Sequence, residues 1–409
     1  MRGFTAHAAT ERMLILFAVA LALGALASGC DSAPVVVATP IAPAPTQPAT
    51  ATSVAPTATT APPTPTSSPT QAAATPGAAW APTIRWRDGD RYLVGVNYPY
   101  FHYGNDFGGN AWGSYGVHDP ATYAAVDADF THMESLGIHT VRWFVFTDGR
   151  AGITFDGTGM PSGIDEFVTK DFDAALEIAQ RHNIGINFVL LDFRFMYDAQ
   201  TENGVQLGGH AAVLASPAGM QALVSNVFEP LFRRYARHPA VLSWEVMNEP
   251  EWTLRDAGTV HKEVSQPLTL AQFRTFVKLT VQAIHNIAGS YATIGCADMK
   301  WAQNWEGLDL DYYEIHFYDW MQPYSTDNLF SVRAESLRLD RPVVVGEFPA
   351  DHSTVAGLRD YLNNWYTNGY AGAWAWSFRP DAQWGGPDSE VMSSWTDAHK
   401  STVSIPPAP

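Results

Sequence analysis

Two glutamates, Glu249 and Glu347, stand directly after short apolar runs of the chain. The first lies in the segment 244–250 (WEVMNEP) and the second in 345–348 (VGEF). A carboxylate at the end of an apolar run is costly unless it is paired or used in a reaction. Two neighbouring carboxylates can cleave a glycosidic bond, since one protonates the leaving oxygen while the other attacks the anomeric carbon. Like-charge repulsion then raises the pKa of one of them, which keeps that group protonated as the acid.

The elements that must position this pair are eight short apolar, β-branched or aromatic runs. They occupy residues 92–98, 140–146, 184–191, 241–247, 291–296, 312–317, 342–347 and 371–376. Continuous apolar runs of this length are typical of strands buried on both faces, as in parallel sheets. Helical patterns separate most of them, near 121–136, 171–182, 217–236, 270–287 and 354–367, whereas 297–311 is short and loop-like.

This alternation predicts an α/β fold, a (β/α)₈ TIM barrel that forms one catalytic domain. A doubly wound open sheet is the alternative, and the lack of a Gly-rich phosphate loop after the first run weakens it. In such barrels the chemistry lies at the C-terminal ends of the strands, where Glu249 and Glu347 stand. Cys296, which ends the fifth run, is interpreted as a buried apolar residue rather than a nucleophile.

The tripeptide Asn248-Glu249-Pro250 after the fourth run, with Glu347 after the seventh and 98 residues later, resembles clan A glycoside hydrolases. The resemblance is to family 5 in particular, the cellulase and β-mannanase family, and it covers about residues 85–400. It implies that Glu249 is the general acid/base and Glu347 the nucleophile of a retaining reaction.

Further residues match the family pattern one by one. The resemblance implies that Arg142 keeps the nucleophile ionised by charge pairing and that Asn248 bonds the sugar 2-hydroxyl. It also implies that the Tyr318 hydroxyl bonds the nucleophile and that His316 lies near the acid/base. Trp376 matches the tryptophan that forms the floor of the subsite before the cleavage point, where its indole offers a flat apolar platform.

Other positions are less clearly matched. Many family 5 cellulases have a histidine at the end of the third strand, whereas this chain offers Asp192 or Arg194, which leaves mannan open beside glucan. Asn97 lies near the end of the first run, and Trp252 and Trp301 lie in loops after later runs, so these three are expected to contact substrate. Trp305, Trp320 and Trp384 are further loop tryptophans that could serve as sugar platforms.

The function predicted from these residues is a retaining glycoside hydrolase of β-linked glycans, an endo-β-1,4-glycanase acting on mannan or glucan. The alternatives are a barrel that binds carbohydrate at the cell surface without cleaving it, an exo-acting β-glycosidase, and a two-lobed solute-binding protein. We expect no metal or other cofactor, because the sequence has no His-x-x-x-His and no cluster of cysteines. The protein is expected to be a monomer.

The N-terminal segment predicts export. Arg2 and Arg12 precede an apolar run over 13–27, which is shorter than the roughly 20 residues of a membrane span. The run ends in 26–30 (LASGC), which resembles a bacterial lipobox, so residues 1–29 are interpreted as a lipoprotein signal peptide and Cys30 as the lipidated residue. An ordinary secretory signal is the alternative. The mature protein is therefore expected on the outer side of the cytoplasmic membrane or at the cell surface.

Residues 30–79 are rich in Ala, Pro and Thr, and this composition predicts a disordered linker. All 14 tryptophans lie at or after Trp80, so the folded domain is expected over 80–409. The formal charge of the chain is −17, which argues against nucleic acid as a partner. The expected partners are a β-linked glycan and, through Cys30, a lipid bilayer.

Overall fold

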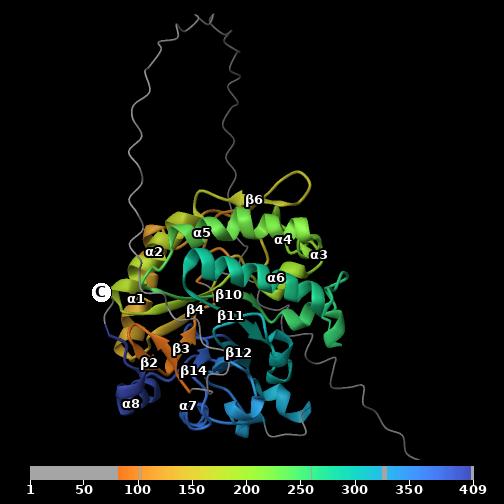
Figure 1. Ribbon diagram of the computed structural model, residues 1–409. Coiled ribbons are helices and arrows are strands. Elements are labelled where there is room, and N and C mark those ends of the chain that lie inside the picture. Colours follow the sequence, from red (N-terminus) through yellow and green to blue (C-terminus); the bar gives the residue numbers. More distant parts are fainter. Residues whose placement is uncertain (1–81, 100, 103, 259, 325–328, 407–409) are drawn as a thin grey trace, which may run out of the picture. The chain divides into compact units, whose positions relative to one another are not determined.

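The computed structural model describes residues 82–406 except 100, 103, 259 and 325–328. Its centre is a closed barrel of eight parallel strands, drawn in Figure 1. In barrel order these are β3 (Leu93–Asn97), β4 (Thr140–Phe144), β7 (Gly185–Val189), β10 (Val241–Asn248), β11 (Tyr291–Cys296), β12 (Tyr313–His316), β13 (Val343–Pro349) and β14 (Gly372–Trp376). Every apolar run expected to be a barrel strand forms one, and the predicted barrel is confirmed.

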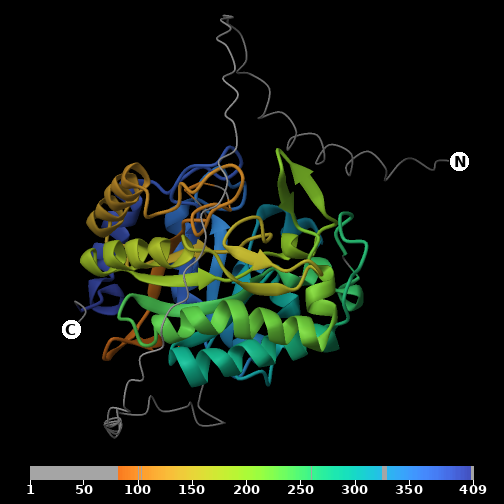
Figure 2. The same cartoon turned by 90° about the horizontal axis from the view of Figure 1, so that it is seen from above.

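Helices surround the barrel at the positions that the apolar periodicity predicts. They are α1 (Pro120–Ser135), α2 (Val168–Arg181), α4 (Pro217–Leu223), α5 (Glu229–Arg234), α6 (Leu270–Ala283) and α7 (Leu358–Thr367). A π-helical turn, Val224–Phe228, joins α4 to α5, and another, Ile284–Ala288, extends α6. In Figure 2 the green α4–α5 helix and the teal α6 helix run side by side on the outside of the barrel.

Local chemistry explains where these helices begin. Asp119 caps α1 by accepting hydrogen bonds from the backbone N–H groups of Ala121 and Thr122, and Pro120 occupies the first helical position. Thr269 and Gln272 form a capping box at the start of α6. Short helices α3 (Ala211–Ala215), α8 (Ser389–Ala398) and α9 (Lys400–Val403) add to the outer layer.

Two connections of the barrel carry only 3₁₀ turns within the described residues. The turn η6 (Met299–Trp305) follows β11, and η7 (Asp319–Tyr324), η8 (Leu329–Ser331) and η9 (Ala334–Leu337) follow β12. The segment after β11 is thus short and loop-like, as expected, and the outer layer departs from a regular ring of eight α-helices. The loops that follow these strands are at the end of the barrel where Glu249 lies.

Three small antiparallel hairpins were not predicted, because each strand has only three or four residues. They pair β1 (Ile84–Trp86) with β2 (Gly89–Arg91), β5 (Ile153–Phe155) with β6 (Pro161–Ile164), and β8 (Gln200–Glu202) with β9 (Val205–Leu207). Trp86 of the first hairpin is buried in a cluster with Leu93, Leu242 and Tyr312, which lie at the starts of barrel strands. The N-terminal end of the barrel is therefore closed by apolar packing.

Candidate active site

Glu249 and Glu347 lie together at the C-terminal end of the barrel. Glu249 follows β10, and Glu347 stands in the second half of β13. One carboxyl oxygen of each glutamate and a ring nitrogen of His316 all lie within 4.8 Å of one another. Retaining glycoside hydrolases hold their carboxyls about 5–5.5 Å apart, whereas inverting ones leave about 6.5–9.5 Å for a water molecule. The separation therefore fits direct attack by one glutamate.

Glu347, the expected nucleophile, is held by hydrogen bonds to both carboxyl oxygens. Its Oε1 accepts a hydrogen bond from Arg142 Nη1 at 2.6 Å, and its Oε2 accepts one from the Tyr318 hydroxyl at 2.7 Å. Burial raises the pKa of Glu347, and the positive charge of Arg142 and the hydrogen bond from Tyr318 oppose this rise. The Glu347 side chain is almost fully buried, with an exposed fraction of 5%. The two donors stabilise its ionised form, which burial alone would disfavour, and hold the carboxylate in place.

Glu249, the expected acid/base, is fixed through its backbone and both carboxyl oxygens. Its backbone is left-handed, with φ of 46° and ψ of 49°, and its N–H donates to Gly295 O at 2.8 Å. Its Oε1 lies 2.7 Å from His316 Nδ1, and its Oε2 accepts a hydrogen bond from Trp252 Nε1 at 2.8 Å. Burial raises the pKa of Glu249, which favours the protonated carboxyl that an acid needs.

His316 is uncharged beside the acid. Burial lowers the pKa of its imidazole to about 4, so the ring is neutral at neutral pH. A neutral ring exchanges a hydrogen bond with Glu249 without stabilising its ionised form as a cation would. His316 therefore lies beside Glu249, the expected acid/base, and as a neutral ring it favours the protonated form of that carboxyl.

Arg142 lies at the centre of the site and is fully buried. Its Nε and Nη2 bind the two oxygens of Glu245 at 2.7 and 2.6 Å, and Nη2 also donates to Asn248 Oδ1 at 2.7 Å. Its Nη1 donates to Glu347 and, at 3.0 Å, to Asn97 Oδ1. One rigid planar guanidinium thus holds both Glu347, the predicted nucleophile, and Asn248, the predicted ligand of the sugar 2-hydroxyl.

Asn97 plays a part that differs from the expected contact with substrate. Its amide nitrogen donates to Gly346 O and Trp374 O at 2.8 and 3.2 Å, and its oxygen accepts from Arg142. The side chain is fully buried, so its polar atoms are used inside the barrel. Asn97 therefore positions Arg142.

The orientation of Asn248 is fixed on both sides. Its Oδ1 accepts from Arg142 Nη2, and its Nδ2 donates to Asp192 Oδ2 at 2.8 Å. The bond to Asp192 uses one of the two amide hydrogens, and because the amide is planar it also fixes the direction of the second hydrogen. Asp192, at the end of the third barrel strand, thus contacts Asn248 where many family 5 cellulases have a histidine. Its other oxygen accepts from the backbone N–H of Arg194 at 2.9 Å.

The predicted aromatic platforms divide into open and packed residues. Trp376 is half-buried at the end of β14, and its Nε1 donates to Asp381 Oδ2 at 2.7 Å. Trp252 is also half-buried and contacts Trp320 at 6.1 Å between ring centroids. Trp301, in contrast, is 8% exposed and lies edge-on to Trp252, with Lys300 Nζ 4.2 Å from its ring centroid.

Trp301 therefore packs against Trp252 and presents little surface to a sugar. This differs from the expected contact with substrate. Trp305 is fully buried, and its Nε1 donates to Glu251 Oε1 at 2.7 Å. Trp384 is half-buried, and its ring centroid lies 5.2 Å from that of Tyr318, whose hydroxyl binds Glu347.

Three buried carboxyls near the site were missed by sequence reasoning. Glu245 and Glu314 point into the barrel beneath Arg142, and Glu251 joins the loops after β10 and β11 through Trp305 and the N–H of Ala297. The available signal was a charged residue flanked by apolar neighbours within a strand, as in 244–246 and 313–315. Such a residue in a buried strand needs a partner inside the barrel.

The three groups Glu249, His316 and Glu347 also have the donor types of a metal site. However, the guanidinium of Arg142 lies 2.6 Å from Glu347 and would repel a cation. Trp252 and Tyr318 already donate hydrogen bonds to the carboxylates. This environment suits acid/base and nucleophilic chemistry better than metal binding.

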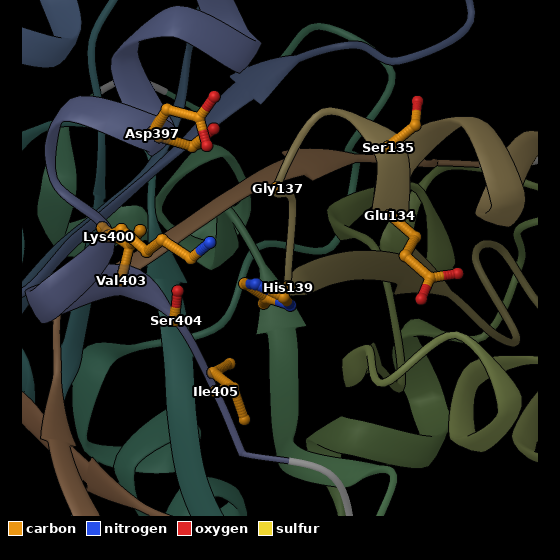
Figure 3. Close-up of a pocket in the computed structure, with 10 residues that line it drawn as sticks. Glu134, Ser135, Gly137, His139, Asp397, Lys400, Val403, Ser404 and Ile405 are labelled. Atoms are coloured by element: carbon orange, nitrogen blue, oxygen red, sulfur yellow. The ribbon is translucent and has the colours of Figure 1, made fainter.

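A separate pocket, shown in Figure 3, lies away from this chemistry. Its lining includes Glu134, His139, Asp397 and Lys400, and His139 directly precedes β4, at the opposite end of the strand from the catalytic pair. None of the predicted site residues lines it.

Comparison with known proteins agrees with the geometry. The family described as Cellulase (glycosyl hydrolase family 5) matches residues 103–380, more than half of the chain. A mannan endo-1,4-beta-mannosidase of Mytilus edulis is 25% identical over 326 residues, which are 72% of this chain and 85% of the relative. One of Cryptopygus antarcticus is 23% identical over 339 residues, 74% of this chain and 83% of that protein.

Solved structures share the fold. A β-mannanase from the blue mussel Mytilus edulis superposes with a TM-score of 0.67 at 22% identity, covering 80% of this chain and 98% of that one. An endo-1,4-beta-mannanase from Eisenia fetida superposes with a TM-score of 0.65 at 21% identity, covering 76% and 92%. With the family match and the paired glutamates at the barrel rim, the chain belongs to glycosyl hydrolase family 5.

Proposed function

We propose that this enzyme is an endo-β-1,4-mannanase that cleaves its substrate with retention of anomeric configuration. The observation that carries the retaining mechanism is the close pair Glu249 and Glu347, with Arg142 and Tyr318 on the second. The choice of mannan rests on the relatives, whose names describe mannan endo-1,4-beta-mannosidases. Asp192, which replaces the strand-three histidine of many cellulases, also favours a substrate other than glucan.

The reaction proceeds in two displacements. In the first, an oxygen of Glu347 bonds to the anomeric carbon while the glycosidic C–O bond breaks and Glu249 gives its proton to the leaving oxygen. In the second, Glu249 takes a proton from water, the water oxygen bonds to the anomeric carbon, and the bond to Glu347 breaks. Arg142 and Tyr318 stabilise Glu347 when it leaves as a carboxylate.

The test is product analysis on mannan, glucan and xylan with wild type and with Glu347→Ala and Glu249→Ala. We expect mixed β-1,4-mannooligosaccharides from mannan at early times, because an endo-acting enzyme cuts within chains. Each variant should lose at least about 10³-fold in kcat. Azide should restore turnover of an activated aryl glycoside by Glu249→Ala, since the anion replaces the water that needs a base. Release of mannose alone, or a preference for glucan, would overturn the proposal.

We propose further that the protein is exported and anchored by a lipid on Cys30, with residues 31–79 as the tether. This rests on the sequence alone, since residues 1–81 lie outside the described part of the chain. Among the helices of the described residues, none combines the length and the apolar composition of a membrane span. Metabolic labelling with a fatty-acid analogue should mark wild type and Cys296→Ala, the matched control at a buried thiol, but not Cys30→Ala. Equal labelling of Cys30→Ala would refute the anchor.

A further inference from the structure

Two buried glutamates lie beneath the catalytic pair, and neither touches the site of bond cleavage. Glu245 of β10 binds Arg142 through both oxygens, and Glu314 of β12 places its Oε2 3.2 Å from Arg142 Nε. Asn187 Nδ2 joins the two carboxyls by donating to Glu245 Oε2 and Glu314 Oε1, at 3.0 Å each. All four side chains are fully buried.

The charges of this cluster do not balance if every acid is ionised. One guanidinium, Arg142, faces three carboxyls, those of Glu245, Glu314 and Glu347. Glu245 accepts a bidentate pair of hydrogen bonds from Arg142, which is the geometry of a charged pair, and Glu347 must be ionised to attack the anomeric carbon. A third buried carboxylate would lack a counter-charge, and such a charge costs several kcal/mol unless a proton neutralises it.

The hydrogen bonds show which oxygen can carry this proton. Ser243 Oγ donates to Asn187 Oδ1 at 2.8 Å, so the amide is oriented with Nδ2 as the donor toward both glutamates. Glu314 Oε1 is therefore an acceptor. Among the described residues Glu314 Oε2 accepts no well-formed hydrogen bond. Arg142 Nε lies 3.2 Å from it, but the single N–H of that nitrogen already donates to Glu245 Oε2.

The two carboxyls are adjacent, since the same Asn187 nitrogen lies 3.0 Å from an oxygen of each. Burial, the charge of Glu245 and a hydrogen bond with Glu245 raise the pKa of Glu314 well above its usual range, although Arg142 and Thr293 oppose this rise. Two adjacent buried carboxyls are stabilised when one of them carries a proton, as in the paired aspartates of aspartic proteases.

The barrel makes room for this pair with glycines. A Cβ atom at Gly295 would lie 2.4 Å from Glu245 Oε1, and one at Gly346 would lie 2.7 Å from Glu314 Oε2. Neither distance is possible without displacing a carboxyl. The strands on either side of Glu314 thus leave space for both acids beneath Arg142.

We propose that Glu314 is a protonated positioning residue, which shares one proton with Glu245 and thereby leaves the positive charge of Arg142 available to the nucleophile Glu347. This rests on the proposed role of Glu347. The carboxylic acid of Glu314 donates its hydrogen bond to Glu245, and Glu245 holds the guanidinium. The other edge of the guanidinium then holds Glu347 and Asn248 in register.

The test compares Glu314→Met with Glu314→Gln in the mature enzyme. Met removes the hydrogen bond to Glu245, and we expect a loss of about tenfold in kcat/KM. Gln keeps a neutral donor of the same shape, and we expect it to recover most of that loss, with the acid limb of the pH profile where wild type has it. If Glu314 were ionised, Gln would remove a negative charge beside Arg142, and the acid limb would move to lower pH by about one unit. That shift would overturn the proposal.

Infrared spectroscopy of enzyme with ¹³C-labelled glutamate gives a readout that does not depend on activity, and it applies even if Glu314→Met fails to fold. Wild type at alkaline pH should retain a protonated carboxyl band that Glu314→Gln lacks. A wild-type spectrum without such a band, or a band that persists in Glu314→Gln, would refute the assignment. Failure of the mannan assay with this band present would separate the proton assignment from the proposed function.

Discussion

Replacing Tyr318 with Phe isolates the hydrogen bond that holds the nucleophile. The Tyr318 hydroxyl donates to Glu347 Oε2 at 2.7 Å, and the other oxygen of Glu347 remains on Arg142. The substitution removes one oxygen atom from a buried position and leaves the ring in place, so the change is confined to this bond.

The structure sets the size of the effect. A hydrogen bond to a charged group contributes about 1.5–3 kcal/mol, and one pKa unit corresponds to about 1.4 kcal/mol. Because the hydroxyl stabilises the carboxylate, its loss should raise the pKa of Glu347 by about one to two units. The carboxylate is also the leaving group of the second displacement, so kcat should fall by roughly 10–100-fold.

The assay is the pH dependence of kcat/KM on β-1,4-mannan or an aryl β-mannoside. The acid limb of this profile reports ionisation of the nucleophile in the free enzyme, so it should move to higher pH. Tyr313→Phe is the matched control, because the Tyr313 hydroxyl donates to Asp340 Oδ1 at the same 2.7 Å and makes no contact with Glu347. Equal acid limbs in wild type and Tyr318→Phe would refute the assigned role of Tyr318.

Three further predictions follow from contacts around the pair. Trp252→Phe removes the N–H that stabilises ionised Glu249, so the pKa of Glu249 should rise. The alkaline limb of the kcat/KM profile should then move to higher pH by about half to one pH unit, and a shift to lower pH would contradict the geometry. Asp192→Ala removes the acceptor that orients the amide of Asn248, and kcat should fall about tenfold with little change in KM. A change in KM alone would show instead that Asp192 contributes equally to binding the substrate and the transition state. Prolonged dialysis against EDTA should leave the activity unchanged, because the guanidinium of Arg142 beside Glu347 disfavours a bound cation. A loss of activity that a divalent metal restores would instead identify Glu249, His316 and Glu347 as metal ligands.

The barrel itself could be predicted from sequence because its strands are buried on both faces. Runs such as 184–191 and 342–347 are almost wholly apolar, and each forms a strand, β7 and β13. The hairpins β1–β2 and β8–β9 could not be predicted, because strands of three residues carry too few side chains to show an alternating pattern.

That Glu249 and Glu347 lie close together could be predicted because two features coincide at each of them, namely position at a strand end and the family pattern. Glu314 could not be identified in this way, because its partners Arg142, Asn187 and Glu245 lie on other strands, and only closure of the barrel brings them together. The same holds for Trp301, whose place in a loop suggested an open platform until its packing against Trp252 was known.

The most direct test of the central claim is proton NMR of the first sugars released from β-1,4-mannan, recorded before mutarotation. Two displacements at one carbon, through an ester with Glu347, should give the β-anomer first. An α-anomer as the first product would show that water attacks the substrate directly. It would contradict the assignment of Glu347 as nucleophile and the inference that its short distance from Glu249 indicates a retaining mechanism.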